Sequence, residues 1–462
     1  LSSWVICPKD KNINSLIPIC PRSFFDSLNS TYVLNNKYYE RILCKQDSVL
    51  QEIIVKGKNI IGPRLLKSKL FYSKGSIPYA YILPKNKDVY KFRPVVSYFS
   101  HPFKKLFNLS AKAISALLKL IDNNYHFILW KTGDLKDRLK NLLLERRVGI
   151  RRRKLFVRAF DIKEFYTNLS HDEIRKAFLW LFNEVRKKLR NANFVTVPHN
   201  KVDEPRITSY PLFLPKWTCF DFDLLFEIIC FDLDNIYFSV GNVLLKQRKG
   251  LPMGSPLSPV ASILTAAFYE FEFLSNLEKN DRVLIDGIRY IDDILVFGFS
   301  ENGEKFERIT AEVLDRFQKF CYHSDLILEN EPINNNRVVF LEGDLFIEED
   351  SVMMCHKNKN WPLIREKNEQ IIKRFVIWNS FCSRHIKRGI VIGALFRILV
   401  NSSSEFIAAN SMLKILLEFN AIGYPWNFII RILKFLNMER KEFSNIVSYV
   451  LCILYRAACV VL

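Results

Sequence analysis

The chain has 462 residues, 49% of them hydrophobic, which is enough for about two to four structural units with sizeable cores. Its formal net charge of +20 points to a polyanionic partner, although charge alone does not choose between RNA, DNA and an anionic membrane. No uncharged apolar run approaches the ~18 residues of a bilayer span, and the ten cysteines form no C-x-x-C pair. These features argue against a membrane protein, a zinc site and a disulfide scaffold, and they predict an intracellular protein with reduced thiols.

The first clear pattern is a β-hairpin that carries basic residues. Residues 1–75 mix short apolar runs with polar clusters, and Lys9–Asn12 has the composition of a turn. Tyr79–Leu83 and Arg93–Tyr98 are β-type runs on either side of a basic turn. That turn contains Lys85, Lys87 and Lys91. Such cations could hold a triphosphate, and an ordinary basic turn is an equally good interpretation.

A basic run and a strand that ends in an acid follow a helix predicted over Phe103–Leu120. Arg146–Lys154 holds six basic residues in nine, which indicates either contact with a phosphate backbone or a solvated face. Leu155–Ile162 alternates as a strand, and Asp161 ends its otherwise apolar face. A carboxylate without a partner is costly there, so Asp161 is a candidate functional residue.

The next segment is predicted to be a helix followed by an insertion. Ser170 and Glu173 have the spacing of a capping box, which predicts the start of a helix. Apolar residues then recur at helical spacing as far as Leu189 and predict a face that packs against a core. Asn191–Lys216 is polar and interrupted by prolines, and we expect an insertion loop there.

A Gly/Pro-rich loop precedes the most apolar helix of the central region. Gln247–Pro259 is dense in Gly, Pro and Ser, and Val260–Leu274 continues at helical spacing. The glycines allow close backbone approach, although a purely structural loop is the plain alternative. Further along, Glu304–Phe320 predicts a helix and Val338–Ile347 a hairpin. Beyond about residue 365 the pattern is helical, with a helix stop and restart at Gly423-Tyr424-Pro425.

Two adjacent carboxylates lie in the stretch around which the chain is organised, Ile288–Phe297. Asp292 and Asp293 stand between two β-type runs, which predicts a hairpin with acids at its tip. Extended alternation would place Tyr290 and Asp292 on one face and Asp293 on the other. A solvated turn is the common interpretation of such a pair. Burying both acids costs several kcal/mol unless a cation or hydrogen-bond donors compensate.

Five motifs in order resemble those of reverse transcriptases. They are R-P-V-V-S from Arg93, D-I-K-E-F-Y from Asp161, G-L-P-M-G-S-P-L-S-P from Gly250, Y-I-D-D from Tyr290 and F-L-E-G from Phe340. Met253 and the sequence after Asp161 are similar to the reverse transcriptases of Penelope-like elements, which are relatives of telomerase. An early D-K-N and the tail motifs L-F-R-I-L and G-Y-P also resemble that family. The likeness runs from near residue 5 to about residue 430.

The resemblance implies an α+β fold of the right-hand polymerase type, with fingers, an antiparallel-sheet palm and a helical thumb. The expected divisions are an N-terminal segment on the fingers (1–75), fingers (76–150), a palm with the insertion near 191–216 (151–350) and a thumb (365–462). The resemblance also implies an RNA-directed DNA polymerase that uses an RNA template, a DNA primer and dNTPs. Neither the nucleus nor an organelle such as the mitochondrion is favoured as the compartment, and protein partners are not indicated.

The family motifs also assign roles to individual residues. Asp161, Asp292 and Asp293 would be the catalytic acids. Asp161 and Asp292, with the Ile162 carbonyl, would hold two Mg²⁺ ions, for which Mn²⁺ is a substitute. The expected nucleotide-binding residues are Lys85, Arg93, Tyr166, Met253, Gly254, Ser255 and Pro256, with the Tyr166 ring as the steric gate against a ribose 2′-hydroxyl. The expected primer grip is Phe340, Leu341 and Gly343.

The chain departs from the family in several respects. It contains no GIY-YIG endonuclease signature and no evident telomerase RNA-binding domain, and Ser324–Arg337 lacks the lysine that many polymerases use as a proton donor. Leu1 is not an initiator methionine, so we allow for a fragment of a longer chain. A domesticated, catalytically silent nucleic-acid-binding protein is the alternative function. An RNA-templated RNA polymerase is a third, which the aromatic Tyr166 disfavours.

Overall fold

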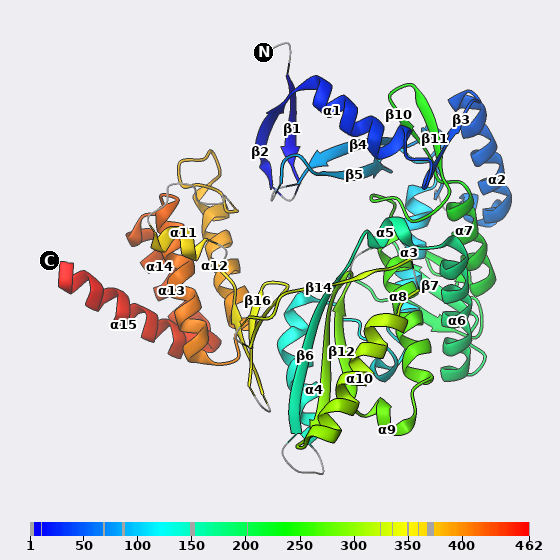
Figure 1. Cartoon of the computed structure of the whole chain (residues 1–462). Coiled ribbons are helices and arrows are strands. Elements are labelled where there is room, and N and C mark those ends of the chain that lie inside the picture. The colour runs from blue at the N-terminus through cyan, green and yellow to red at the C-terminus, as the bar shows by residue number, and fades with distance from the viewer. Residues whose placement is uncertain are drawn as a thin grey trace. The chain divides into compact units, whose positions relative to one another are not determined.

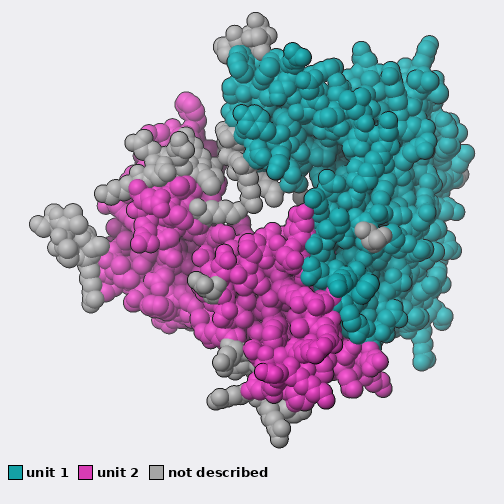
Figure 2. Space-filling model, viewed as in Figure 1, with its two compact units in different colours: residues 1–128, 162–277, 316–328 teal, residues 129–161, 278–315, 329–462 magenta. Residues whose placement is uncertain are grey.

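The computed structural model describes residues 4–10, 12–67, 70–85, 88–147, 153–200, 202–323, 325–334, 336–348, 351–358, 360–366 and 374–461 (Figure 1). The chain forms two compact units, each assembled from three separate segments (Figure 2). Unit 1 comprises Leu1–Ile128, Ile162–Leu277 and Arg316–Leu328, and unit 2 comprises Leu129–Asp161, Glu278–Asp315 and Glu329–Leu462. The chain therefore passes from unit 2 to unit 1 directly after Asp161.

The described residues of unit 1 form three small sheets. Its five-stranded sheet has the order β3–β11–β10–β4–β5, in which only the β10–β4 contact is parallel, and a two-stranded hairpin β1–β2 belongs to the N-terminus. The strands of these two sheets are β1 (Val5–Lys9), β2 (Asn12–Ile19), β3 (Tyr39–Ile42), β4 (Tyr79–Pro84), β5 (Phe92–Ser97), β10 (Tyr237–Val240) and β11 (Val243–Gln247). The predicted turn at Lys9–Asn12 and the predicted hairpin after Pro78 are both confirmed.

The insertion at Asn191–Lys216 is not a loop, and that prediction was wrong. It contributes to a sheet of order β8–β7–β9, made of β7 (Phe194–Pro198), β8 (Arg206–Thr208) and β9 (Trp217–Asp221). Val195 and Val197 of β7 are fully buried although the segment as a whole is polar. Short strands between prolines carry too few residues for an alternating pattern to stand out from a loop.

Helices cover the sheets of unit 1. They are α1 (Pro21–Leu28), the π-helical turn Asn29–Val33, α2 (Gln46–Lys67), α3 (Lys104–Leu118), α5 (Phe165–Asn168), α6 (His171–Lys188), α7 (Phe222–Asp234) and α8 (Ser258–Ser275). α8 follows the Gly/Pro-rich loop and is buried along most of its length, from Ser258 to Leu274. A helix that is apolar on all sides lies inside a protein, so the loop is anchored to the interior of this unit.

The start of α6 differs from the predicted capping box. Ser170 occupies the N-cap position, but its side chain makes no capping hydrogen bond. Glu173 instead forms an ion pair with Lys176 at 2.7 Å. The helix itself is confirmed, and its apolar residues Ile174, Phe178 and Leu181 are fully buried. Burial of this face therefore decides the helix, because packing contributes more to helical stability than a cap does.

Unit 2 is built around a four-stranded sheet of order β12–β13–β6–β14. Its strands are β6 (Arg153–Ile162), β12 (Ile285–Tyr290), β13 (Asp293–Glu301) and β14 (Leu328–Asn330). The associated helices are α4 (Leu135–Arg147), α9 (Lys279–Arg282) and α10 (Glu304–Phe320), whose last turn is counted with unit 1. Ala159, Leu295 and Phe297 belong to one buried cluster on this sheet, which confirms the apolar face predicted for β6.

A second sheet and a helical bundle complete unit 2. The sheet has the order β15 (Arg337–Phe340), β16 (Gly343–Ile347) and β17 (Val352–His356). The bundle consists of α11 (Trp361–Arg365), α12 (Arg384–Val400), α13 (Glu405–Ala421), α14 (Trp426–Glu439) and α15 (Ser444–Val461). Gly423, with φ +94°, lies between α13 and α14, where the sequence predicts the stop and restart.

Within the described ranges, no helix is long and apolar enough to cross a bilayer. Free thiols are found at Cys7, Cys20, Cys44, Cys219, Cys230, Cys321, Cys355, Cys382 and Cys452.

Candidate active site

The register of β6 against β13 brings two of the predicted acids together. Asp293 is the direct cross-strand partner of Asp161, and the antiparallel pairing continues without interruption from there to Glu301 and Arg153. Directly opposite residues have Cβ atoms about 4.5–5.5 Å apart on the same face of the sheet. Two carboxylates in such a pair repel each other, so the apolar cluster behind them must hold the register. The structure therefore places Asp161 and Asp293 side by side at the end of a buried face.

A two-residue turn connects β12 to β13 and contains Asp292. Tyr290 pairs directly with Asp293, which leaves only Ile291 and Asp292 in the turn. The expectation that Tyr290 and Asp293 lie on opposite faces was wrong. They are direct cross-strand partners and share a face, because extended alternation stops at the turn. Ile291 has φ +61°, a left-handed conformation that costs a β-branched residue about 1–3 kcal/mol. Asp292 thus lies at a strained hairpin tip next to the Asp161–Asp293 pair in sequence.

Arg289, which sequence reasoning did not single out, supports this turn. Its side chain is fully buried, and Nη1 donates to the carbonyl oxygen of Ile291 at 3.2 Å. Its own carbonyl accepts a hydrogen bond from the Leu129 N–H at 2.7 Å. A buried guanidinium requires such acceptors, because it stays charged at all accessible pH values. The sequence feature that could have identified Arg289 is a charged residue between apolar ones, in I-R-Y-I-D-D.

The donor chemistry of the three acids fits a hard divalent cation. Carboxylate oxygens are the ligands that Mg²⁺ prefers, and Asp161 and Asp293 bring two of them to one edge of the sheet. In the described part of the chain, no three His, Cys, Asp or Glu side chains are grouped as a ready metal site. The argument for a divalent cation here therefore rests on the chemistry of carboxylate oxygens and on the pairing of Asp161 with Asp293.

In unit 1, the Gly/Pro-rich loop is attached by its backbone to two other predicted site segments. The Leu251 N–H donates to the Tyr166 carbonyl at 2.7 Å, and the Val96 N–H donates to the Met253 carbonyl at 2.9 Å. A Cβ on Gly254, which has φ +134°, would lie 2.1 Å from the Val96 carbonyl oxygen. Only glycine permits this approach, so the loop lies directly against β5.

Ser255 points into the protein and not out of the loop. Its side chain is buried, and Oγ donates to Oδ2 of Asp232 on α7 at 3.4 Å. Asp232 is itself buried, and this desolvation raises its pKa to about 7. Burial, followed by the charge of Asp232, also raises the pKa of Tyr98. Gly254 is exposed and its neighbours Met253 and Pro256 are half-buried, so a ligand can reach these three residues.

The neighbouring aromatic residues Phe165 and Tyr166 differ in burial. Phe165 is buried at 3% exposure, whereas Tyr166 is only half-buried. Their rings meet edge to face with centroids 6.0 Å apart. Phe165 therefore fills the core position, and the Tyr166 ring remains partly accessible, as a gate would have to be.

The predicted triphosphate contacts lie on the β4–β5 hairpin of unit 1. Lys85 is exposed, and its N–H donates to the Lys91 carbonyl at 2.7 Å, which continues the hairpin beyond the strands. Arg93 pairs across to Leu83, and its Nε donates to Oδ2 of Asp10 at 3.0 Å. Lys87 lies outside the described residues, as does most of the basic run Arg146–Lys154.

The predicted primer grip lies in the β15–β16 turn of unit 2. Phe340 pairs with Gly343, so Leu341, with φ +55°, and Glu342 form the turn. Phe340 is 3% exposed and belongs to the sheet core, whereas Leu341 is half-buried. A primer contact at Phe340 would therefore use its backbone, and the accessible side chain is that of Leu341.

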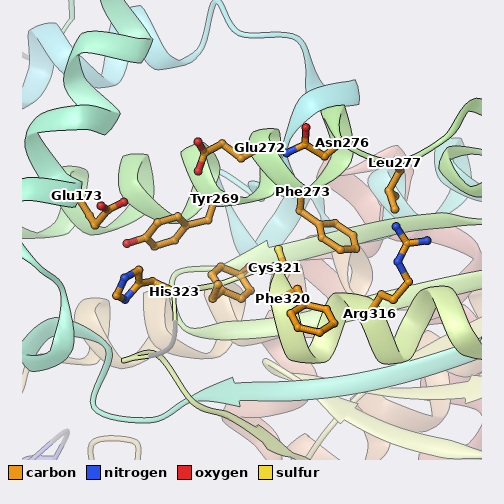
Figure 3. Close-up of a pocket in the computed structure, with 11 residues that line it drawn as sticks. Glu173, Tyr269, Glu272, Phe273, Asn276, Leu277, Arg316, Phe320, Cys321 and His323 are labelled. Carbon is orange, nitrogen blue, oxygen red and sulfur yellow. The ribbon is translucent and has the colours of Figure 1, made fainter.

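A pocket of about 420 Å³ lies elsewhere in unit 1 (Figure 3). Figure 3 shows the Tyr269 ring between Glu173 and His323, with Glu272 beside it. Burial, and next the charge of Glu173, raises the pKa of Glu272. None of the residues that the sequence assigns to the site lines this pocket.

We predict that Gly254→Ala detaches the loop from β5. The added Cβ would meet the Val96 carbonyl, a backbone atom that cannot turn aside, and alanine is also strained at φ +134°. Unfolding in denaturant should show a loss of about 2–4 kcal/mol. Gly241→Ala is the control, because Gly241 has φ +55° but nothing within 4 Å of its Cβ position. Equal losses in the two variants would contradict the close approach.

A pH-dependent effect is expected for Asp232→Asn. Because the folded-state pKa of Asp232 is raised to about 7, protonated Asp232 stabilises the fold at low pH, and that stability is lost as the pH rises through 7. The variant stays neutral, so its Tm should exceed that of the natural chain by several degrees at pH 8 and match it near pH 4.

Asp234→Asn is the matched control for thermal unfolding, since Asp234 lies on the same helix with an exposed side chain paired to Arg175. A Tm difference for Asp232→Asn that is constant from pH 4 to pH 8 would show that Asp232 does not change its protonation state in that range, contrary to this prediction.

Solved structures resemble the chain along almost its whole length, while no protein-family model and no curated protein sequence matches it. Apo telomerase from Candida tropicalis matches with a TM-score of 0.50 and 15% identity over 98% of this chain and 74% of that one. Telomerase from Candida albicans in complex with the TWJ fragment of telomeric RNA matches with a TM-score of 0.51 and 14% identity, covering 97% of this chain and 73% of that one. The chain therefore has the α+β fold of a right-hand polymerase, as the sequence predicts.

Proposed function

We propose that the chain is an RNA-directed DNA polymerase that extends a primer 3′-hydroxyl with dNTPs on an RNA template. The observation that carries the proposal is the direct pairing of Asp161 with Asp293, beside a turn that contains Asp292. Two carboxylates brought side by side at the ends of neighbouring strands offer the oxygen ligands that a divalent cation prefers. The resemblance to telomerase in fold supports a polymerase class.

The acids would act as ligands for two Mg²⁺ ions. Asp161 and Asp292, with the Ile162 carbonyl, would hold the ions, and Asp293 would contribute its charge from the position opposite Asp161. When bound, the ions activate the attacking hydroxyl and stabilise the departing pyrophosphate. The strained Ile291 turn and its hydrogen bond from Arg289 would keep Asp292 at the tip of the hairpin.

The residues of unit 1 would bind and select the nucleotide. Lys85 and Arg93 are cations on one hairpin and would bind the triphosphate. Gly254 is exposed and would present its backbone to the nascent base pair, while its missing side chain lets the loop lie against β5. Tyr166 would exclude the ribose 2′-hydroxyl with its accessible ring.

Within the reverse transcriptases, we assign the chain to the Penelope-like type. Met253 and the early D-K-N at Asp10 support that assignment. The net charge of +20 supports an RNA template and an RNA–DNA hybrid as partners. The compartment would be one that holds nucleic acid, either the nucleus or an organelle.

Asp161→Asn and Asp292→Asn should each abolish primer extension and leave template–primer affinity within about threefold of the natural chain. The amide removes a metal ligand but little of the phosphate-backbone binding. Extension rates and binding by fluorescence anisotropy are the measurements, with Asp315→Asn as the control, because Asp315 pairs with Arg158 away from the hairpin tip. Natural rates in either variant would contradict the assignment. A natural chain that binds template but extends nothing with Mg²⁺ or Mn²⁺ would favour a silent binding protein.

For Tyr166→Ala, we expect ribonucleotide use relative to deoxyribonucleotide use to rise at least about tenfold, or roughly 1.4 kcal/mol of lost discrimination. Removal of the ring opens the space that the 2′-hydroxyl needs. The kcat/KM ratio for the two sugars is the measurement. Phe165→Ala is the matched control, because Phe165 is buried and its loss should lower stability without changing the ratio. An unchanged ratio in Tyr166→Ala would place Tyr166 in the core.

A further inference from the structure

The turn between β1 and β2 contacts both strands of the β4–β5 hairpin through a single residue. The backbone N–H of Asp10 donates to the Pro84 carbonyl at the end of β4 at 2.9 Å. Its carboxylate accepts a hydrogen bond from Nε of Arg93 on β5 at 3.0 Å. Figure 1 shows the β1–β2 hairpin at that end of β4 and β5. Asp10 therefore connects the N-terminus of the chain to the hairpin that carries the predicted triphosphate contacts.

A second contact fixes the same end of the hairpin. Phe92, which pairs with Pro84 and precedes Arg93, packs edge to face against Phe24 of α1 with ring centroids 6.2 Å apart. The backbone around Arg93 is thus held from two sides by the N-terminal segment. The side chain of Arg93 has only the carboxylate of Asp10 as its recorded ion-pair partner in the described residues.

The geometry of this ion pair leaves part of the guanidinium available. The carboxylate engages Nε, so the Nη nitrogens at the far end of the fork keep donors for phosphate oxygens. The side chains are 35% exposed for Arg93 and 15% for Asp10. A partly buried pair is screened less by water than a surface pair, so it can restrain an otherwise flexible side chain.

We infer that Asp10 is a positioning residue that orients Arg93 for an incoming nucleoside triphosphate. The inference rests on the proposed polymerase function, in which Arg93 binds that triphosphate. An arginine that is already ordered loses less side-chain entropy when it binds phosphate, so the nucleotide binds more tightly. Against this, the carboxylate partly neutralises Arg93. The two effects have opposite signs on nucleotide affinity, which makes the inference testable.

The test is a double-mutant cycle on the full chain with an RNA template and a DNA primer. Single-nucleotide extension gives KM for the dNTP and kcat for the natural chain, Asp10→Ala, Arg93→Ala and the double variant. We expect Asp10→Ala to raise KM about tenfold with kcat within about twofold, and to raise KM by less than about twofold in the Arg93→Ala background. Asp10→Asn keeps an acceptor oxygen and should recover part of the loss.

Two controls separate orientation of Arg93 from general damage. Glu52→Ala removes the acid of an exposed ion pair with Lys56 in the same unit, with the same change in net charge, and should leave KM unchanged. Template–primer affinity and Tm are measured for every variant. If the rise in KM for Asp10→Ala is as large with Arg93 removed as with Arg93 present, Asp10 does not act through Arg93, and the inference fails.

Failure of the inference is distinguishable from failure of the proposed function. If Arg93→Ala raises KM while Asp10→Ala leaves it unchanged or lowers it, the positioning role is overturned and the polymerase assignment stands. A lowered KM would mean that Asp10 competes with the nucleotide for Arg93. If the natural chain shows no dNTP-dependent extension at all, the proposed function is overturned together with the inference.

Discussion

The arrangement of the candidate site depends on the antiparallel register between β6 and β13. A shift by one residue would move every side chain of β6 to the opposite face and would separate Asp161 from Asp293. The two carboxylates cannot hold this register themselves, because they repel each other. It is held by buried residues on the same face, such as Ala159 and Leu295, whose burial contributes on the order of 25 cal/mol per Å². The apolar core of the sheet thus provides the free energy that keeps an electrostatically unfavourable pair in place.

The hairpin tip next to these acids also has an unfavourable local conformation that contacts with neighbouring residues stabilise. Ile291 is a β-branched residue in a left-handed conformation, and only a turn held by its neighbours retains such a residue. Its support includes the buried Arg289, which donates to the Ile291 carbonyl. Strain and buried charge therefore concentrate within four residues of sequence. A turn restrained in this way limits the conformational freedom of its backbone, which suits the proposed role of Asp292 as a metal ligand.

In unit 1 the position of the Gly/Pro-rich loop is fixed by close backbone contact and not by charge. Gly254 lies so near the Val96 carbonyl that no side chain fits, and Ser255 turns inward to Asp232. The loop is therefore attached to β5 on one side and to the Tyr166 turn on the other. Arg93 is on the same strand as Val96, about 10 Å away along an extended chain, so the loop and the predicted triphosphate contact share one support. The Asp10 turn extends that support to the N-terminus.

The sequence by itself determined the elements whose patterns are local: the β4–β5, β12–β13 and β15–β16 hairpins, helix α10 and the acids at the end of β6. Hydrophobic periodicity and turn residues act over a few positions, so they can be recognised without knowledge of the fold. Only the tertiary structure decided that Asp161 faces Asp293, that Ser255 points to Asp232, and that Arg93 pairs with Asp10. The Arg93–Asp10 pair joins residues that lie 83 positions apart in the chain. The strands within the insertion at Asn191–Lys216 were also not recognisable from the local sequence, because burial in the folded chain decides them. Register, burial and ion pairing between distant segments are set by how the whole core packs, and no short stretch of sequence contains that information.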